Sequence, residues 1–308
     1  MSAKSNTNRD DNKIPFYDTN DNSLVSNLVT HLCELFFEHL GCNFPFLQRD
    51  RFLRDLKDKK VNTMLVNVVC ALSARFSPHP LLGSPQSLTI DGYKESHDWE
   101  MFDRGHPFAC RARGALVDSL SCPTLSVAQA CLLLAYEEFG SNRDSGLWMY
   151  LGISIRMAQD LGIQKRHGLY RPTDEPLSEE PGNNRYEPSH SPDGSVQDIE
   201  DSKRESEDTF WCIYFLDRVI SSGTGRPVTL VDEDIQLCFP TQSESVVSNG
   251  WPAPFPPLIR IIHLYGRATD IINGIQDVND VTDDTVKRLA SLESDLTGKS
   301  SFLNHDTE

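Results

Sequence analysis

One long apolar helix pattern, which ends at a pair of glycines, constrains the fold of this chain more than any other feature. It lies within residues 205–240, and its apolar residues are Phe210, Trp211, Ile213, Tyr214, Leu216, Val219 and Ile220. Their spacing is that of a buried helix. Ser206 is expected to cap the helix, because acidic residues follow it in the first turn. Gly223 and Gly225 are expected to end the helix, and Pro227 to fix the direction in which the chain leaves it.

Further segments with helical spacing occur on both sides of this stretch, separated by short turns. They cover residues 23–41, 49–59, 62–75, 107–120, 127–139, 145–161, 258–275 and 285–296. The segment 62–75 is apolar on nearly every side, so we expect it to be central, and Gly298 is expected to end the last segment. An alternation of helix and short turn is typical of stacked antiparallel helix pairs. The sequence therefore predicts an all-α fold, a bundle of paired antiparallel helices with long acidic and Pro-rich loop inserts.

Polar stretches interrupt the helical pattern and set the expected domain organisation. Residues 1–22 are rich in Asn and Asp and are predicted to be disordered. Residues 170–202 form an acidic insert, predicted to be a flexible loop, and residues 241–257 form a Pro-rich loop. One domain is therefore expected over 23–298, followed by a frayed tail at 299–308.

The charge balance argues against a nucleic-acid-binding surface on this chain. With 29 Lys and Arg against 45 Asp and Glu, the formal net charge is −16. Contacts to phosphates need clustered basic side chains instead. Half of the net negative charge falls within residues 171–208.

The cysteines and the hydropathy pattern indicate the kind of compartment. None of the eight cysteines lies close to another in sequence, and several lie inside apolar helical segments. We interpret them as reduced core residues of an intracellular protein. No stretch has the character of a secretory signal or the length of a membrane span, so we expect a soluble protein with no membrane partner.

Two long motifs occur in a fixed order on either side of the acidic insert. The first is GLWMYLGISIRMAQDLGIQK at 146–165, and the second is FW-x-x-Y-x-L-D-R followed by S-x-x-x-G-R-P and D-x-D-I within 205–240. Both resemble motifs of the regulatory "middle homology" domain of fungal zinc-cluster transcription factors, the first being similar to its L-G-x-x-I-R-M-A-x-D-L-G helix. The resemblance covers residues 24–275.

This resemblance implies a function that composition does not. It implies a domain that controls transcription by RNA polymerase II in the nucleus, by switching an attached DNA-binding module in response to a metabolite or partner. The implied partners are transcription coactivators or corepressors, a small-molecule effector and, in some arrangements, a second copy of the chain. The acidic insert 170–202 is a candidate contact surface for coactivators, since acidic disordered segments can fold on their partners.

The chain departs from the family in one respect. The family's DNA-binding cluster holds two zinc ions with six cysteines and opens with Cys-x-x-Cys, a pattern that this sequence lacks. We therefore expect no cofactor in this chain, zinc only in a cluster outside it, and DNA contact only through such a module. Three explanations stay open: the cluster lies upstream on a longer natural chain, the gene model is truncated, or the domain acts without its own DNA reader.

Four charged residues lie inside the apolar helical patterns, namely Arg156, Asp160, Asp217 and Arg218. A charge buried in a helix packing is tolerable only when it is paired. In one interpretation these residues pair with one another or with helix ends and hold the two motif helices together. In the other, Arg156 or Arg218 faces a small anionic effector in a pocket between helices.

The remaining candidate structural or regulatory residues are Trp211 in the second motif helix and Gly225, Arg226 and Pro227 in the turn that follows it. Gly225 is expected to supply backbone freedom and Pro227 rigidity. Arg226 is expected to reach a helix C-terminus or a carboxylate. A phosphate-binding loop is excluded here, because no strand precedes the glycines and no Gly-Lys-Ser/Thr follows them.

The patterns that would indicate a metal site or catalysis are incomplete. The set His31, Cys33, His39 and Cys42 is spread over different faces of its helix. His106 and Cys110 share a face but lack further ligands. No nucleophile elbow or His-Glu-x-x-His occurs, so we expect no catalytic, cofactor-binding or metal residue and no enzyme. Two alternatives stay open: a helical metal-dependent enzyme using Asp232 and Asp234, and a helical scaffold that binds no ligand.

Overall fold

The computed structural model describes residues 14–21, 23–82, 104–165, 196–240, 253–275 and 277–303. Its helices are α1 (Asn27–His39), α2 (Arg49–Lys57), α3 (Thr63–Ser73), α5 (His106–Ser119), α6 (Leu125–Gly140), α7 (Asp144–Leu161), α8 (Val196–Thr224), α9 (Phe255–Asn273) and α10 (Asp283–Leu303), with short 3-10 turns that include η4 (Asp232–Asp234). The described part of the chain contains no strand, so the predicted all-α fold is confirmed. None of its helices combines the length and the apolarity needed to cross a membrane.

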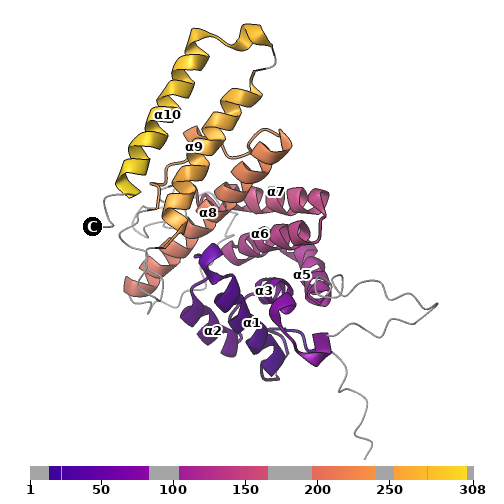
Figure 1. The fold of residues 1–308 in the computed structure, drawn as a ribbon. Helices are drawn as coiled ribbons and strands as arrows, with labels where there is room; N and C mark the ends of the chain where they lie inside the picture. Colours follow the sequence, from indigo (N-terminus) through magenta and orange to yellow (C-terminus); the bar gives the residue numbers. More distant parts are fainter. Residues whose placement is uncertain are drawn as a thin grey trace, which may run out of the picture. The chain divides into compact units, whose positions relative to one another are not determined.

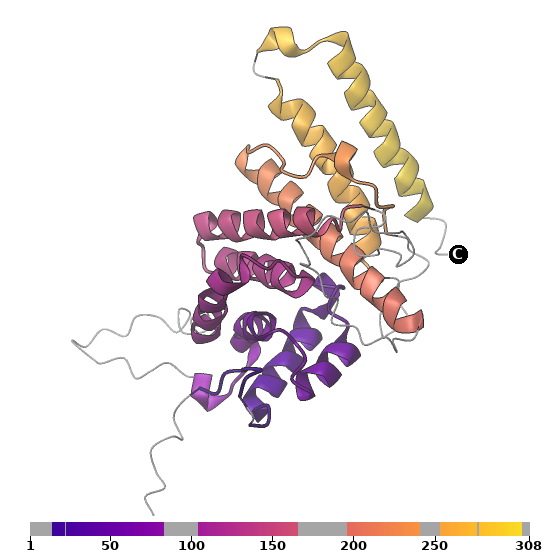
Figure 2. The ribbon, with the colours of Figure 1, turned by 180° about the vertical axis from the view of Figure 1, so that it is seen from behind.

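The described helices fall into two compact units. The first unit contains α1 to α7 and the beginning of α8, through Ser206. The second unit contains the rest of α8, η4, α9 and α10. Within the first unit α6 and α7 run side by side, and within the second α9 and α10 do so (Figure 1, Figure 2).

Helix α3 is the centre of the first unit. Every residue of α3 from Met64 to Ser73 is buried, and α1, α5 and α6 pack against it. The side chain of Asn62 caps the helix by accepting the N–H groups of Met64 (2.9 Å) and Leu65 (3.3 Å). The prediction that this segment is central is confirmed.

Helix α6 packs on α7 to complete the first unit. Its middle is buried on all sides, and the Ser154 hydroxyl of α7 donates to the Ala128 carbonyl of α6 at 2.8 Å. Gly146 lies where α7 approaches the end of α6, and a Cβ there would overlap the Glu138 carboxylate. A larger residue at this position would therefore have to displace the Glu138 carboxylate.

The second unit has two apolar layers. The motif half of α8 buries aromatic residues, among them Phe210, Trp211 and Tyr214. Between α9 and α10, a smaller core consists of Leu264, Ile271 and Leu292, with Ala268 and Leu289 packed against it. The apolar residues of both layers lie in segments that the sequence predicted to be helical, 205–240, 258–275 and 285–296.

Several helix ends differ from the sequence expectation, and α1 begins at Asn27, capped by Ser26, rather than at residue 23. The predicted N-cap at Ser206 is wrong, because α8 begins at Val196 and Ser206 is buried inside it. The first turns of α8 carry no apolar stripe, and contacts with α2 and its N-cap residue stabilise them. Arg51 of α2 pairs with Glu205 at 3.1 Å, and the side-chain amide of the N-cap residue Gln48 donates to the Asp201 carbonyl at 3.4 Å. The end of the predicted flexible insert, residues 196–202, is therefore helical.

Two further differences concern the second unit. Helix α9 begins at Phe255, inside the predicted Pro-rich loop, because prolines are tolerated in a first helical turn, where their missing N–H has no partner to bond. Helix α10 continues past Gly298 to Leu303, so the predicted end at Gly298 is wrong. A glycine inside a helix costs only about 1 kcal/mol relative to alanine, which the helix tolerates.

The remaining predictions for loops lie largely outside the described residues. These are the N-terminal residues 1–13 and 22, the insert over 170–195, the loop over 241–252 and the tail over 304–308. The extent of a single domain over 23–298 stays a prediction. The cysteines divide evenly: Cys33, Cys70, Cys131 and Cys212 are buried as expected, whereas Cys42, Cys110, Cys122 and Cys238 are exposed.

Candidate functional site

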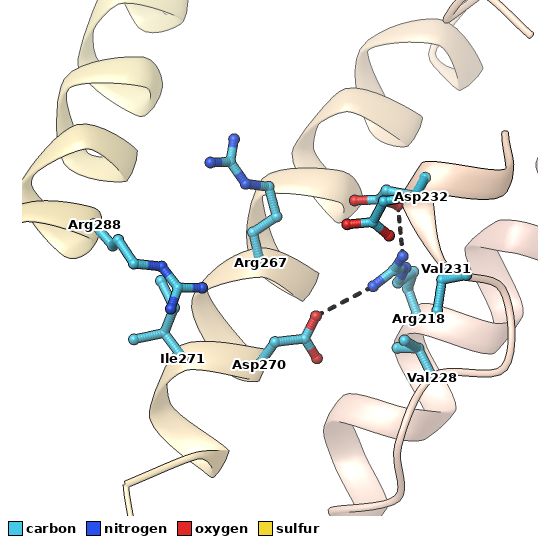
Figure 3. A pocket seen from close by; sticks show the side chains of 9 residues that line it. Arg218, Val228, Val231, Asp232, Arg267, Asp270, Ile271 and Arg288 are labelled. Carbon is cyan, nitrogen blue, oxygen red and sulfur yellow. Dashed lines mark hydrogen bonds and ion pairs between the residues drawn. The ribbon is translucent and has the colours of Figure 1, made fainter. Parts of the chain in front are cut away.

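A cavity of about 230 Å³ lies within the second unit, among α8, the segment that follows it, α9 and α10 (Figure 3). Its lining residues are Arg218, Val228, Val231, Asp232, Glu233, Arg267, Asp270, Ile271 and Arg288. Three arginines and three acidic residues thus share one small space with three apolar side chains. This concentration of opposite charges makes the cavity the candidate site.

Arg218 is the most deeply buried charge in the cavity wall, with 2% of its surface exposed. Its Nη2 donates to Asp232 Oδ1 at 2.6 Å and to the Leu230 carbonyl at 2.9 Å. Its Nη1 donates to Asp270 Oδ2 at 3.4 Å, and its guanidinium lies 4.9 Å from the centre of the Tyr214 ring. One guanidinium therefore joins α8 to η4 and α9, which favours the structural interpretation of this residue.

Asp217, next to Arg218, holds the segment that leads into the cavity wall. It is fully buried, and its Oδ2 accepts the backbone N–H groups of Thr229 and Leu230, both at 2.9 Å. Burial raises the pKa of Asp217 above its ordinary value, while these hydrogen bonds act in the opposite direction. Residues 229 and 230 belong to neither a helix nor a strand, so their N–H groups have no regular backbone acceptor, and the Asp217 carboxylate accepts them instead.

The turn between α8 and this segment has the geometry that its glycine suggests. Gly225 adopts a φ of +67°, in the left-handed region that glycine enters at no steric cost. The Ser221 hydroxyl of α8 donates to the Pro227 carbonyl at 3.3 Å, which fastens the turn to the helix. Arg226 lies on the exposed surface of the turn.

A cluster of aromatic residues packs beside Arg218 and its partner Asp232. Trp211 is buried and stacks on Phe239, with ring centres 5.1 Å apart. The hydroxyl of Tyr214 lies 3.0 Å from Asp232 Oδ1 and 2.9 Å from His263 Nδ1. Burial raises the pKa of the Tyr214 hydroxyl, so it stays protonated and acts as a neutral partner.

These contacts bear on the metal-dependent alternative. Asp232 is engaged by Arg218, by the Tyr214 hydroxyl and by His263, whose Nδ1 lies 3.4 Å from its Oδ2. A carboxylate already bound to a guanidinium is a poor ligand for a cation. Asp234 is exposed on η4, and no group of three potential metal ligands occurs among the described residues. The described geometry therefore offers no support for a metal site at Asp232 and Asp234.

Two arginines of the cavity, Arg267 and Arg288, were not singled out from the sequence. Arg267 on α9 lies 3.7 Å from Asp295, and both side chains are nearly half exposed. Arg288 is exposed and reaches from α10 toward α9 (Figure 3). No motif marks either residue, because only the packing of α10 on α9 brings them to the cavity that Arg218 lines.

Arg156 and Asp160 of α7 belong to the first unit and have different surroundings. Both are exposed, and Arg156 Nη1 donates to the side chain of Gln159, one turn away on the same helix, at 3.0 Å. Because water solvates both charges, neither needs a partner in a helix packing.

Comparisons with known proteins place the chain in a family. The model of the fungal specific transcription factor domain matches residues 33–295. The Zn(2)-C6 fungal-type transcription factor FTF1c of Fusarium oxysporum f. sp. lycopersici is 27% identical over 305 residues, which cover 89% of this chain and 28% of that relative. No solved structure matches the chain significantly.

Two further relatives come from other fungi. The nitrogen assimilation transcription factor nit-4 of Neurospora crassa is 29% identical over 148 residues, 44% of this chain and 12% of that relative. An uncharacterized transcriptional regulatory protein of Schizosaccharomyces pombe is 31% identical over 144 residues, 46% of this chain and 13% of that relative. The matched part of the chain thus spans less than a third of each relative's length. With the family model matched over most of its length, the chain belongs to the family of fungal specific transcription factor domains.

Proposed function

We propose that this domain is the regulatory part of a fungal zinc-cluster transcription factor and controls RNA polymerase II transcription in the nucleus. In this proposal a small ligand binds the cavity of the second unit and switches a DNA-binding module attached to the domain. Family membership and the names of the relatives, all of them transcription factors or transcriptional regulators, support the regulatory role. The cavity carries the proposal of a ligand.

The charges of the cavity suggest the chemical class of this ligand. Arg218 already has two carboxylates and a carbonyl as partners, so it is not the group that a ligand would contact first. Arg267 and Arg288 are exposed and lie at the α9–α10 side of the cavity. Glu233 and Asp270 line the same space. A small zwitterion such as a free amino acid fits this arrangement, with its carboxylate toward the arginines and its ammonium toward the acids.

Such a ligand would act by changing the balance between two packings of the second unit. It would join α10, which carries Arg288, to α9 and to the segment after α8. A ligand shifts a conformational equilibrium only by its difference in affinity for the two states. The core between α9 and α10 is small, so a bridging ligand can contribute a large share of the contacts there.

Thermal unfolding and a reporter assay test this proposal together. The purified chain is heated with each of the twenty free amino acids in turn, at millimolar concentration. One that saturates the site should raise Tm by at least about 2 °C. Arg288→Ala should abolish the rise, whereas Lys287→Ala, an exposed neighbour on the same helix, should preserve it.

The reporter assay asks whether binding matters for transcription. The chain is fused to an unrelated DNA-binding module, and output is measured with and without the amino acid that raises Tm. We expect the amino acid to change the output of the unaltered and Lys287→Ala fusions and not that of Arg288→Ala. No Tm rise with any amino acid, or the same rise in Arg288→Ala, would contradict the ligand. A fusion whose output depends on a stable protein partner alone would favour the scaffold alternative.

A further inference from the structure

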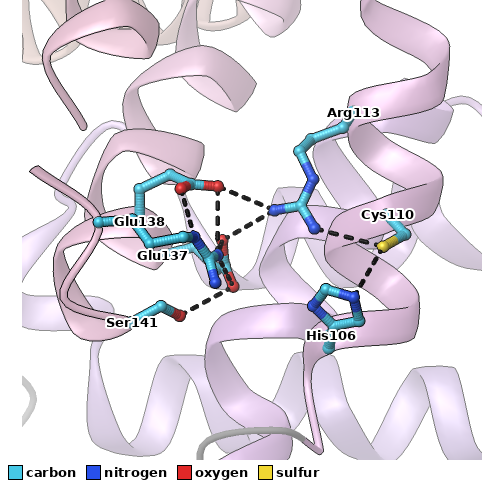
Figure 4. A network of polar contacts seen from close by, with 7 residues as sticks. His106, Cys110, Arg113, Glu137, Glu138 and Ser141 are labelled. Atoms are coloured by element: carbon cyan, nitrogen blue, oxygen red, sulfur yellow. Dashed lines mark hydrogen bonds and ion pairs between the residues drawn. The ribbon is translucent and has the colours of Figure 1, made fainter. Parts of the chain in front are cut away.

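A second polar cluster lies in the first unit, where α5 meets the end of α6 (Figure 4). Glu137 and Glu138 of α6 are each only 5% exposed. Arg113 of α5 donates through Nη1 to Glu138 at 2.9 Å and to Glu137 at 3.2 Å. Arg143 donates to Glu138 at 2.6 Å and to Glu137 at 3.1 Å. Two arginines thus pair with two buried carboxylates, and the charge of Glu137 also acts on a third arginine, Arg75.

The thiol of Cys110 shares one of these arginines. Nη2 of Arg113 donates to Cys110 Sγ at 3.3 Å, whereas the bonds to the glutamates come from Nη1. His106 Nε2 lies 3.2 Å from the same sulfur, as the spacing of four residues suggested. Burial alone would lower the pKa of the Arg113 guanidinium, but its hydrogen bond with Cys110 and the two glutamate charges raise it. Cys110 is exposed, so small molecules in solvent can reach its sulfur.

This arrangement contains the parts of an activated nucleophile. A thiol becomes a good nucleophile when a base within hydrogen-bonding reach takes its proton and a cation lies beside the sulfur. His106 supplies the base and Arg113 the cation. Glu137 and Glu138 orient Arg113, so the cation keeps its position.

We propose that Cys110 is a reactive thiol that small uncharged electrophiles alkylate. With iodoacetamide, the thiol proton passes to His106 Nε2, the sulfur forms a bond to the methylene carbon, and iodide leaves with the electron pair of the broken carbon–iodine bond. No oxidant or reductant takes part. The site is separate from the cavity of the second unit, so its reactivity does not depend on the ligand proposed there.

The chain contains its own controls. Cys42, Cys122 and Cys238 are also exposed. Among the described residues no cation contacts any of these sulfurs, and the Cys42 thiol lies 3.8 Å from the neutral side chain of Asn43. Cys131 is fully buried in α6, so its labelling reports unfolding of the first unit.

A short pulse of iodoacetamide on the native full chain, followed by digestion and mass spectrometry, gives an alkylation rate for each cysteine. We expect Cys110 to react roughly tenfold faster than Cys42, Cys122 and Cys238. His106→Gln should lower the Cys110 rate by roughly tenfold and leave the other three rates unchanged. Cys131 should stay unlabelled in both proteins.

Two results would overturn the proposal. In the unaltered chain, a Cys110 rate no higher than that of the other exposed cysteines would reduce this thiol to a hydrogen-bond acceptor for Arg113. That comparison needs no variant, so it holds even if His106→Gln unfolds and exposes Cys131. In a folded His106→Gln protein, an unchanged Cys110 rate would remove the base from the mechanism.

Discussion

Helices α7 and α8 carry the same kind of sequence, an arginine and an aspartate set among apolar residues, but they place these charges differently. On α7, Arg156 and Asp160 are exposed. On α8, Asp217 and Arg218 are buried. The α7 charges are four residues apart and share one face, which can turn to solvent. The α8 charges are adjacent, diverge by about 100° and have apolar neighbours on both sides, and both lie inside the packing.

The consequence for α8 is that each charge needs partners from the chain. Asp217 takes two backbone N–H groups of the segment after the Gly225 turn. Arg218 takes Asp232, Asp270 and the Leu230 carbonyl. Charges that an apolar helix buries thus require partners, and these partners organise the structure around the helix.

Replacing Arg218 should break this organisation most severely. Arg218→Ala leaves the Leu230 carbonyl without its donor and Asp232 without its cation, so we expect the free energy of unfolding to fall by about 3–5 kcal/mol. Urea unfolding followed by circular dichroism measures the change. Arg218→Lys is the matched control: it keeps the charge but not the planar fork, and should lose less. A loss below about 1 kcal/mol for Arg218→Ala would mean that these contacts contribute no more than an exposed ion pair.

Asp217→Asn should have a smaller effect that depends on pH. The amide oxygen can take the place of Oδ2 and accept both N–H groups, so at pH 7 we expect a change of about 1 kcal/mol or less. Because burial raises the pKa of Asp217, the folded state binds the proton more tightly than the unfolded state. The tighter proton binding stabilises the wild-type fold at pH values below 3.8, the ordinary pKa of an aspartate. This stabilisation is lost as the pH rises through the raised pKa of Asp217 in the folded state.

The measurement is the difference in unfolding free energy between wild type and Asp217→Asn, taken from urea titrations at several pH values. This difference should be most favourable to wild type at the acidic end and decline toward neutral pH. The other carboxylates titrate in both proteins and cancel. A difference that grows with pH would show that the hydrogen bonds to Asp217 outweigh its burial and lower its pKa.

The comparison of α7 with α8 also shows how far the sequence could predict this molecule. Apolar periodicity located the helices, and the motif stretch 205–240 indicated that Asp217 and Arg218 needed partners. The partners themselves could not be predicted, because Asp270 and the Leu230 carbonyl reach Arg218 through tertiary packing. The polar first turns of α8 were missed for the same reason, since contacts with α2 hold them.

The candidate sites were predictable to different degrees. The spacing of His106 and Cys110 predicted that they share a face, and they lie 3.2 Å apart. Arg113, three residues after Cys110, is at a spacing that also brings side chains together, so its contact with the sulfur could have been suspected. Arg288 of α10 had no such signal, because its approach to the cavity depends on how two helices separated by a turn pack.

Replacing Arg156 on α7 should have the smallest effect on stability, and it tests the comparison between the exposed charges of α7 and the buried charges of α8 most directly. Arg156 donates to Gln159, an uncharged side chain of the same helix, so we expect Arg156→Ala to change the free energy of unfolding by less than about 0.5 kcal/mol. The neighbouring Met157 is 4% exposed, and Met157→Ala should cost about 2–5 kcal/mol in the same urea titration. A loss above about 1 kcal/mol for Arg156→Ala would mean that Arg156 has a structural partner comparable to those of Arg218. Unchanged stability together with a lost reporter response would instead mean that Arg156 contacts an effector. The exposed charges of α7 would then serve binding, whereas the buried charges of α8 stabilise the fold.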